Sequence, residues 1–510
     1  MLSIDIKSKI NKLWDLFWSG GMANPITALE QISYLLFMRR AEDVGLVNED
    51  FYKWSFYTKQ ENDELLSHMK VVFEYLKTQK SQNDSFLKAM EGANFEITKP
   101  SLLDLAIEII DDIYLEAEKE RGKGQHFQDT LGDFYELILN QTGEAGKNGQ
   151  FRTPRHIIQF MCELLKPTIE DTICDVTAGT SGFLVGAYQY IIKNNSNEKA
   201  QIDENGFEKR TSGNLIKIDS EKEEKLTKNT FFGYDIDTTM IRLGMMNLIM
   251  HNVKEPHIKH IDTLSQKFDD LEKNIKYSKI LANPPFTGKI DSLQTSLLLN
   301  KVYEPKFDKY NKRVKQNMQS ELLFLERIIQ LLEINGKAAV IVPEGVLFGR
   351  GKAYKKTREL LLKNCEFEAV ISLPNGVFKP YAGVKTSILL FTKKKDNKTK
   401  WNTKKVWFYE LKSDGYSLDD NRQKLNKNPL PLALKLFESK NKVSNKDRKT
   451  YFFVKIDEIK NNNLDLSYNH YQEIIYEEKE YDPPQVILNA IFSLEKELTI
   501  GLQELNNLIK

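Results

Sequence analysis

The sequence predicts an α/β fold built on a mainly parallel sheet, preceded by a helical N-terminal region and followed by a C-terminal helix. Three observations lead to this class. The N-terminal region carries apolar residues at three- and four-residue spacing, short apolar runs then alternate with amphipathic stretches, and residues 484–510 return to helical spacing. Buried strands that alternate with helices are typical of a parallel sheet.

The N-terminal region, residues 1–125, is expected to form a helical domain. The stretches "NPITALEQISYLLFMRRAED" and "SLLDLAIEIIDDIYLEAEKE" place apolar residues three and four apart and show no strand-like alternation. A glycine-rich polar segment at 141–150 breaks this pattern.

The central region, residues 126–475, is expected to hold the sheet. Amphipathic stretches such as "ELLFLERIIQLLEING" and "TTMIRLGMMNLIMHNV" predict helices, and the polar stretch 193–228 is expected to be a surface insertion. The predicted buried strands are the short apolar runs "DTICDVTAG", "FFGYD", "KILAN", "KAAVIVP", "EAVISLP" and "SILLFTK".

The C-terminal region, residues 476–510, is expected to be a helix that packs on another surface. Three heptads are marginally stable alone, so the helix is expected to contact a partner subunit or its own domain. Its apolar positions follow a 4-3-4-3 spacing: Ile487, Ile491, Leu494, Leu498, Gly501, Leu505 and Leu508.

Composition limits the classes of function. The chain has 73 Lys and Arg against 72 Asp and Glu, whereas a protein that binds DNA alone is usually basic. The three cysteines are widely separated and lack a CxxC pair, which favours a reduced compartment and excludes a zinc site of that kind. The pair His257 and His260 lacks further ligands at suitable spacing, so no metal is expected. No apolar run is long enough to cross a membrane, and we expect a cytoplasmic protein.

A nucleoside site is indicated at the first two strand ends. Small residues between a strand and a helix let a ligand approach the backbone, although a tight turn alone explains them equally well. An acidic residue at the tip of the next strand, here Asp235, is typical of ribose binding, and together the two strand ends favour an adenosine-type site. The residues of the first strand end are Asp175, Gly179, Thr180, Ser181 and Gly182.

A second strand end carries Asn283-Pro284-Pro285-Phe286. A loop-forming turn is one explanation. Another is that the Asn283 side-chain oxygen and the Pro284 carbonyl accept hydrogen bonds from the amine of a nucleobase, which would make its nitrogen lone pair available for attack. Pro285 would fix these acceptors, and Phe286 would offer a face for an extruded base. The second explanation gives each of the four residues a task.

Taken in order, these motifs resemble the amino-group DNA methyltransferases that use S-adenosylmethionine, and most closely the modification subunit of type I restriction–modification systems. The resemblance covers most of the chain. It rests on "LWDLFWSGGMANPITALEQISYLLFMRR", "LGDFYELIL" with "GQFRTPRHI", "DVTAGTSGFL", "GYDID", "IDTL", "NPPF", "VIVPEGVLFGRG" and "SLPNGVFKPYAGVKTSILLF".

The resemblance implies a Rossmann-like S-adenosylmethionine-dependent methyltransferase sheet and N6 methylation of adenine. Asn283, Pro284 and Phe286 would hold the target adenine, and Asp262 would lie near the adenine of the cofactor. The other implied cofactor contacts are Gln150, Phe151, Arg152, Thr153, Pro154, Arg155, Thr180, Ser181, Gly182 and Asp235. The glycine loop departs from the family's commoner residues at Val176, Thr177, Ala178 and Ser181.

The resemblance also implies partners: double-stranded DNA, a separate specificity subunit, a second copy of this chain and, in some complexes, a restriction subunit. Two alternatives stay open from the sequence. A self-sufficient methyltransferase would read its target with residues 394–480, and a non-catalytic binding module would have a decayed cofactor site. The polar tetrad with Asn favours adenine N6 over cytosine N4, although the motif chemistry alone would serve either amine.

Overall fold

The computed structural model describes residues 4–22, 24–43, 45–78, 84–121, 127–144, 153–210, 218–286, 288, 290–379, 383–396, 400–441, 448–473 and 483–509. The chain divides into two compact units, Met1–Tyr471 and Gln472–Lys510. Both domain boundaries expected from the sequence, 125/126 and 475/476, lie outside the described residues.

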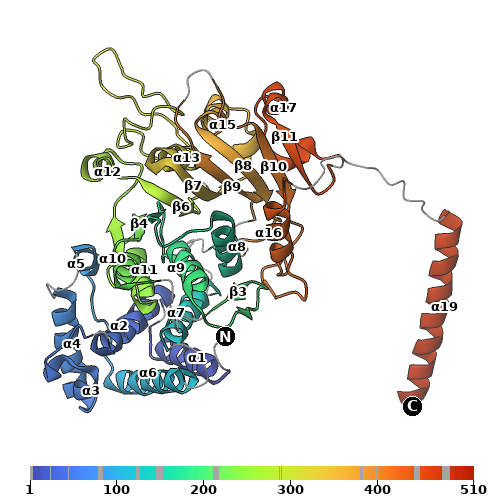
Figure 1. Cartoon of the computed structure of the whole chain (residues 1–510). Helices are drawn as coiled ribbons and strands as arrows, with labels where there is room; N and C mark the ends of the chain where they lie inside the picture. The colour runs from blue at the N-terminus through green and yellow to red at the C-terminus, as the bar shows by residue number, and fades with distance from the viewer. Residues whose placement is uncertain are drawn as a thin grey trace. The chain divides into compact units, whose positions relative to one another are not determined.

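The N-terminal region is helical, as predicted (Figure 1, blue). Helix α2 is buried nearly all round, so it forms the centre of this region. Two of its buried polar side chains are hydrogen-bonded: the Gln31 amide donates to the Asn94 carbonyl at 3.0 Å, and the Ser33 hydroxyl donates to the Leu29 carbonyl at 2.6 Å. The elements are α1 (Ile4–Ser19), α2 (Pro25–Asp43), η1 (Asp50–Tyr52), α3 (Trp54–Tyr57), α4 (Asn62–Thr78), α5 (Asp84–Met90), α6 (Pro100–Arg121) and α7 (Phe127–Glu144).

The sheet has nine strands in the order β11-β10-β8-β9-β7-β6-β1-β4-β5. Pairing is parallel from β7 through β6, β1 and β4 to β5, whereas β9 and β11 run antiparallel to their neighbours. The strands are β1 (Ile173–Asp175), β4 (Phe231–Asp235), β5 (His257–His260), β6 (Tyr277–Ala282), β7 (Leu332–Pro343), β8 (Cys365–Ser372), β9 (Thr386–Lys393), β10 (Lys405–Glu410) and β11 (Tyr451–Lys455). The predicted α/β class is confirmed.

Both faces of the sheet are covered. Along β7, Ala339 and Ile341 belong to one buried cluster and Val340 and Val342 to another, as the alternation of side chains along a strand requires. The helices of this region are α8 (Arg155–Leu165), α9 (Gly182–Asn195), α10 (Ser220–Lys228), α11 (Thr238–Met250), α12 (Gln266–Leu271), α13 (Ser320–Leu331), α14 (Gly345–Phe348), α15 (Lys352–Asn364), α16 (Leu430–Glu438), α17 (Ile456–Asn461) and α18 (Tyr468–Tyr471).

The N-terminal helices and the sheet share one buried core. Side chains of α2 and α11 belong to the same cluster, and an ion pair joins Arg242 on α11 to Glu30 on α2 at 2.7 Å with both side chains largely buried. The N-terminal helices therefore support α11, the helix that follows the Asp235 strand end.

Two details differ from the sequence prediction. The helix expected in 321–336 ends at Leu331, and the following residues already form β7. The polar stretch 193–228 contains a hairpin, β2 (Gln201–Ile202) with β3 (Glu208–Lys209), and the helix α10.

The second unit contains α19 (Pro484–Ile509), so the predicted C-terminal helix is confirmed. Every apolar position of the predicted heptad that is described lies on this single helix. Among the described helices, none is long and apolar enough to cross a membrane.

Candidate active site

The turn after β1 is organised by two aspartates. The Gly179 amide donates to Asp235 Oδ2 at 2.8 Å, and the Asp237 amide donates to Asp235 Oδ1 at 2.9 Å. The Asp235 carboxylate thus holds the β1 and β4 strand ends together. The parallel arrangement of β1 and β4 brings these residues to one edge, as the motif spacing predicts.

Asp175 lies at the end of β1 and is 1% exposed. Its Oδ1 accepts the Thr177 amide at 3.0 Å. Burial raises the pKa of Asp175 to about 7, and the nearby charge of Asp235 adds to this increase. Asp175 therefore shapes the turn from within the protein.

The glycine turn requires unusual backbone angles and close packing. Gly179 has φ of 50° and Ser181 has φ of 61°, a region that favours glycine. Gly244 on α11 packs against this turn, and a Cβ there would come within 2.5 Å of Ser181 Oγ and 2.8 Å of the Gly179 carbonyl oxygen. Asn247, one turn later on α11, donates to the Thr180 carbonyl at 2.9 Å. Neither Gly244 nor Asn247 was expected from the motifs.

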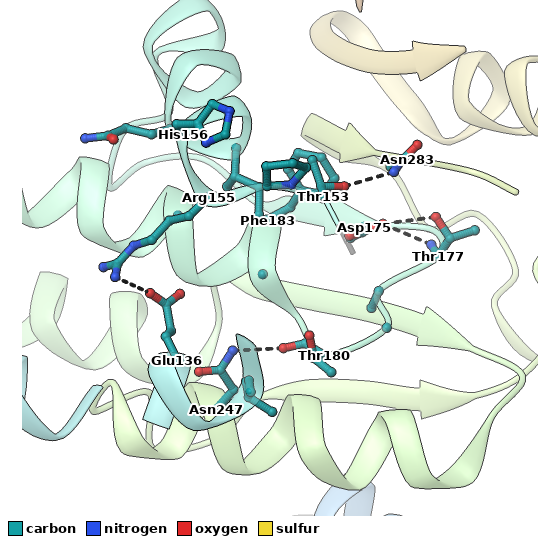
Figure 2. A pocket seen from close by; sticks show the side chains of 18 of the residues that line it. Glu136, Thr153, Arg155, His156, Asp175, Thr177, Thr180, Phe183, Asn247 and Asn283 are labelled. Atoms are coloured by element: carbon teal, nitrogen blue, oxygen red, sulfur yellow. Dashed lines mark hydrogen bonds and ion pairs between the residues drawn. The ribbon is translucent and has the colours of Figure 1, made fainter. Parts of the chain in front are cut away.

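The Asn283 side chain is half-buried directly after β6, and its Nδ2 donates to Thr153 Oγ1 at 2.9 Å (Figure 2). Its Oδ1 is buried and has no hydrogen-bond partner within the described part of the chain. A buried carbonyl oxygen without a donor is costly, so this atom is suited to a donor that a ligand brings.

Pro284 is buried and Pro285 is exposed. Phe286 is 5% exposed and contacts Phe378 edge to face, with ring centroids 5.5 Å apart. The Phe286 ring is therefore covered rather than open, and a base could stack on it only if Phe378 moved.

The segment before α8 gives a mixed result for the predicted cofactor contacts. Gln150, Phe151 and Arg152 lie outside the described residues. Thr153 and Pro154 border the same cavity as Asn283.

Arg155, by contrast, turns toward α7: its guanidinium contacts Asp133 at 2.7 Å and Glu136 at 2.9 Å (Figure 2). Burial opposes the charge of Arg155, but Glu136 and Asp133 raise its pKa. Burial likewise opposes the charge of Asp133, yet Lys209 and Arg155 hold its pKa well below the usual range. Arg155 therefore fastens α8 to α7.

A cavity of about 1750 Å³ joins these features. It is larger than the few hundred to about 1000 Å³ typical of small-ligand pockets. Asp262 is exposed and lies two residues after the end of β5. It also borders the cavity, and its carboxylate accepts the Leu264 amide at 2.9 Å. The described residues that line it include Thr153, Pro154, Arg155, Asp175, Gly179, Thr180, Gly182, Asp235, Asp262, Asn283, Pro284, Pro285 and Phe286.

Part of the cavity wall comes from segments that the motifs do not mark. The β2–β3 hairpin lies in the stretch expected to be a surface insertion, yet several of its residues line the cavity. The hairpin contacts the segment that carries Asp414, because the Tyr416 hydroxyl donates to Asn205 Oδ1 at 3.3 Å. In that segment His156 Nε2 and Asp414 Oδ2 are 2.8 Å apart, and Arg422 also contacts Asp414. Burial opposes the charge of Asp414, but His156 and Arg422 lower its pKa. The ordinary turn residues of these segments give no signal of a site.

Within the described residues, no group of three or more His, Cys, Asp or Glu side chains could hold a metal ion. The polar side chains that line the cavity include carboxylates such as Asp235 and Asp262, amides such as Asn247 and Asn283, and cations such as Lys209, and these groups suit hydrogen bonding to a polar organic ligand.

Comparison with known proteins places these motifs in context. Residues 126–480 match the model of the N-6 DNA methylase family, and residues 6–110 match the HsdM N-terminal domain. The chain is 28% identical over 431 residues to the type I restriction enzyme EcoEI methylase subunit of Escherichia coli, covering 80% of this chain and 78% of that protein. It is 27% identical over 424 residues to the EcoKI methylase subunit of E. coli K12, covering 80% and 72%.

Solved structures share the fold. A chain from a structural study of a type I R-M system aligns with a TM-score of 0.65 at 22% identity, over 99% of this chain and 98% of that one. A modification subunit of a putative type I restriction enzyme from Vibrio vulnificus aligns with a TM-score of 0.63 at 21% identity, over 89% and 92%. At this identity the likeness concerns the fold.

Proposed function

Because the chain belongs to the N-6 DNA methylase family, as an N6-adenine DNA methyltransferase of the type I modification-subunit kind, we propose that it methylates an adenine turned out of the duplex beside Asn283. We propose S-adenosylmethionine as the methyl donor and the edge formed by β1, β4 and β5 as its site. The observation that carries the proposal is the buried Oδ1 of Asn283 at the wall of the cavity, which has no hydrogen-bond partner among the described residues.

The residues at the strand ends fit this cofactor. A Cβ on Gly179 would meet no atom within 4 Å, so the turn borders open space that a ligand can fill. Asp235 and Asp262 supply carboxylate oxygens for the ribose and the adenine amine, and the Thr180–Gly182 turn supplies backbone. When bound, S-adenosylmethionine supplies an electrophilic methyl group. The predicted contact of Arg155 stays a prediction: Arg155 lines the cavity, while its guanidinium is held by Asp133 and Glu136.

Asn283 and Pro284 would act on the target amine. The Asn283 Oδ1 and the Pro284 carbonyl oxygen each accept one N–H hydrogen, which favours a tetrahedral nitrogen with its lone pair free to attack the methyl carbon. A neutral amide is sufficient, because the surplus proton would leave the nitrogen for solvent only after the new N–C bond has formed and the bond between the methyl carbon and the sulfur of the donor has broken. The contribution of these residues is therefore positioning.

We further propose that sequence choice lies in a separate specificity subunit, in a complex with a second copy of this chain and, in some complexes, a restriction subunit. The near-neutral charge and the apolar heptad on α19 support target recognition by a separate subunit. We propose the domains 1–125, 126–475 and 476–510, supported by the family matches at 6–110 and 126–480. The buried, unpaired thiols of Cys162, Cys174 and Cys365 are consistent with the cytoplasm.

The experiment is nucleoside mass spectrometry on DNA from cells that express this chain, with and without a specificity subunit, and with Asn283→Ala as the control. N6-methyladenine that depends on both the partner and Asn283 is the expected result. The same base without the partner would place target recognition in residues 394–480. N4-methylcytosine would refute the proposed substrate, and no methylated base would favour a non-catalytic binding module.

A further inference from the structure

The segment between β6 and α13 projects from the wall of the proposed active site. Its first residues, including Gly288 and Asp291, line the cavity directly after the Asn283 tetrad, and Ser320 lines it again where α13 begins. The segment therefore leaves from and returns to the place where the target base would enter, and its middle forms an extended loop (Figure 1, yellow-green).

The base of this segment is firmly anchored. Glu326 on α13 accepts the amides of Lys301 and Val302 at 2.8 and 3.0 Å. Val302 and Met318 belong to the buried cluster that also contains side chains of α13 and β7. These contacts fix the ends of the segment, so that its tip is held in a defined direction.

The tip is a small hairpin, which we name the 306–314 hairpin. Phe307 and Arg313 pair as an antiparallel bridge, and the Val314 amide donates to the Lys306 carbonyl at 2.8 Å. Asp308 Oδ1 accepts the amides of Tyr310 and Lys312, both at 2.8 Å, which closes the turn.

Positive charge on this hairpin is uncompensated. No carboxylate of the described residues lies within 4.0 Å of the ammonium groups of its lysines, all of which are exposed. The nearest acidic residues in the sequence are already engaged: Glu304 pairs with Lys356 at 2.5 Å, and Asp308 holds the turn. Three lysines of the hairpin, Lys306, Lys309 and Lys312, and Lys315 directly after it recur every third residue.

Aromatic rings accompany these cations. Tyr310, at the turn, is 71% exposed, and Phe307 is 51% exposed. The Lys309 ammonium lies over the Tyr310 ring, 4.9 Å from its centroid. Large exposed rings among lysines combine an apolar surface with cations, the pairing that suits bases and phosphates of nucleic acid. A protein partner would more often require an apolar core with few lysines.

We propose that the 306–314 hairpin binds the DNA duplex beside the flipped adenine, with the four lysines on backbone phosphates and Tyr310 against the bases of the groove. This inference rests on the proposed function, because that function places DNA at the cavity. It also explains how a chain of net charge +1 can hold DNA locally.

The test is the salt dependence of duplex binding by the full chain. The variant carries Lys306→Gln, Lys309→Gln, Lys312→Gln and Lys315→Gln, and the probe is a labelled mixed-sequence duplex of about 30 base pairs. A matched control replaces four exposed lysines of the N-terminal region that also lack a carboxylate within 4.0 Å in the described chain: Lys12, Lys59, Lys70 and Lys88.

Each phosphate contact makes the slope of log affinity against log salt concentration more negative by about 0.9. The magnitude of this slope is therefore expected to be smaller by roughly 3 to 4 in the hairpin variant. The control is expected to retain the slope. Tyr310→Ala is expected to keep the slope and weaken binding about fivefold or more. Equal slopes for the hairpin variant and the control would overturn the proposal, as would absence of salt-dependent binding by the unmodified chain.

Two further readouts separate this inference from the proposed function. Cofactor binding by calorimetry is expected to be unchanged in every variant. If the unmodified chain failed to bind cofactor but the hairpin variant still lost its slope, the proposed function would fail and the hairpin assignment would stand. Loss of association with a specificity subunit at an unchanged slope would assign the hairpin to a protein partner and overturn the DNA proposal.

Discussion

The side chains of Asn283 and Thr153 meet across 130 residues of sequence, with Asn283 Nδ2 donating to Thr153 Oγ1 at 2.9 Å. This hydrogen bond connects the tetrad after β6 to the segment before α8. It leaves Asn283 Oδ1 without a partner in the described chain and so fixes which end of the amide is available to a ligand.

Thr153→Val is expected to lower kcat about fivefold, because the loss of one hydrogen bond of about 1 kcal/mol lets the Asn283 amide rotate away from the orientation that the target amine needs. Thr153→Ser, which keeps the hydroxyl, should restore most of the rate. Steady-state kinetics with saturating S-adenosylmethionine measures both. A rise in the KM for S-adenosylmethionine without a change in kcat would instead assign Thr153 to cofactor binding.

Asn283→Ala is expected to reduce methylation about 100-fold or more, since it removes a preorganised acceptor for the reacting amine. The Kd for S-adenosylmethionine should be nearly unchanged, because the glycine turn and the strand-end aspartates are intact. Calorimetry with the cofactor and methyl transfer to DNA report on the two properties separately. A variant that lost the cofactor as well would show that the assigned role is wrong.

The fold was largely predictable because its central strands are continuous apolar runs. The six predicted strand runs all fall on strands, since burial on both faces leaves few polar positions. Strand β5 was missed because "HIKH" lies at the edge of the sheet and is half polar. Strands β10 and β11 were missed because they follow or flank basic segments and are rich in aromatic residues rather than aliphatic ones.

The candidate site was predictable only where a strand end marks it. Asp175 and Asp235 are the last residues of their strands and Asn283 directly follows one, and parallel strands bring their carboxyl ends to one edge. The ion pairs of Arg155 with α7 depend on how the N-terminal helices pack, which no local pattern encodes. The same holds for Gly244, whose small size matters only because α11 touches the glycine turn.

Asp175→Asn is expected to make the stability of the protein less dependent on pH. The folded pKa of Asp175 is raised to about 7, whereas the unfolded value is about 3.9, so the folded state holds a proton that the unfolded state loses. The protonated carboxyl therefore contributes stability that is fully present below about pH 4 and is lost as pH rises to about 7.

The asparagine is neutral throughout and keeps an oxygen for the Thr177 amide. The free energy of unfolding of Asp175→Asn, relative to that of the native chain, should therefore rise by a few kcal/mol between about pH 4 and pH 7 and stay level above that. Thermal unfolding across this range, without cofactor, measures the difference. A constant difference in Tm would show that Asp175 is ionised in the folded protein at all these pH values.

Gly244→Ala is expected to weaken cofactor binding. Its Cβ would lie 2.8 Å from the Gly179 carbonyl oxygen, a backbone atom that cannot rotate aside, and 2.5 Å from Ser181 Oγ. The turn must shift away from α11, at a cost of about 1 to 3 kcal/mol, and the backbone positions proposed to meet the cofactor shift with it.

The matched control for this variant is Gly345→Ala at the start of α14, where a Cβ would meet no atom within 4 Å. Calorimetric titration with S-adenosylmethionine should give an affinity about tenfold or more weaker for Gly244→Ala and an unchanged affinity for Gly345→Ala, because a penalty of 1.4 kcal/mol corresponds to about tenfold. Equal affinities for the two variants, with the Tm of Gly244→Ala lowered, would show that the turn can move without consequence for the ligand and would remove Thr180 to Gly182 from the proposed cofactor site.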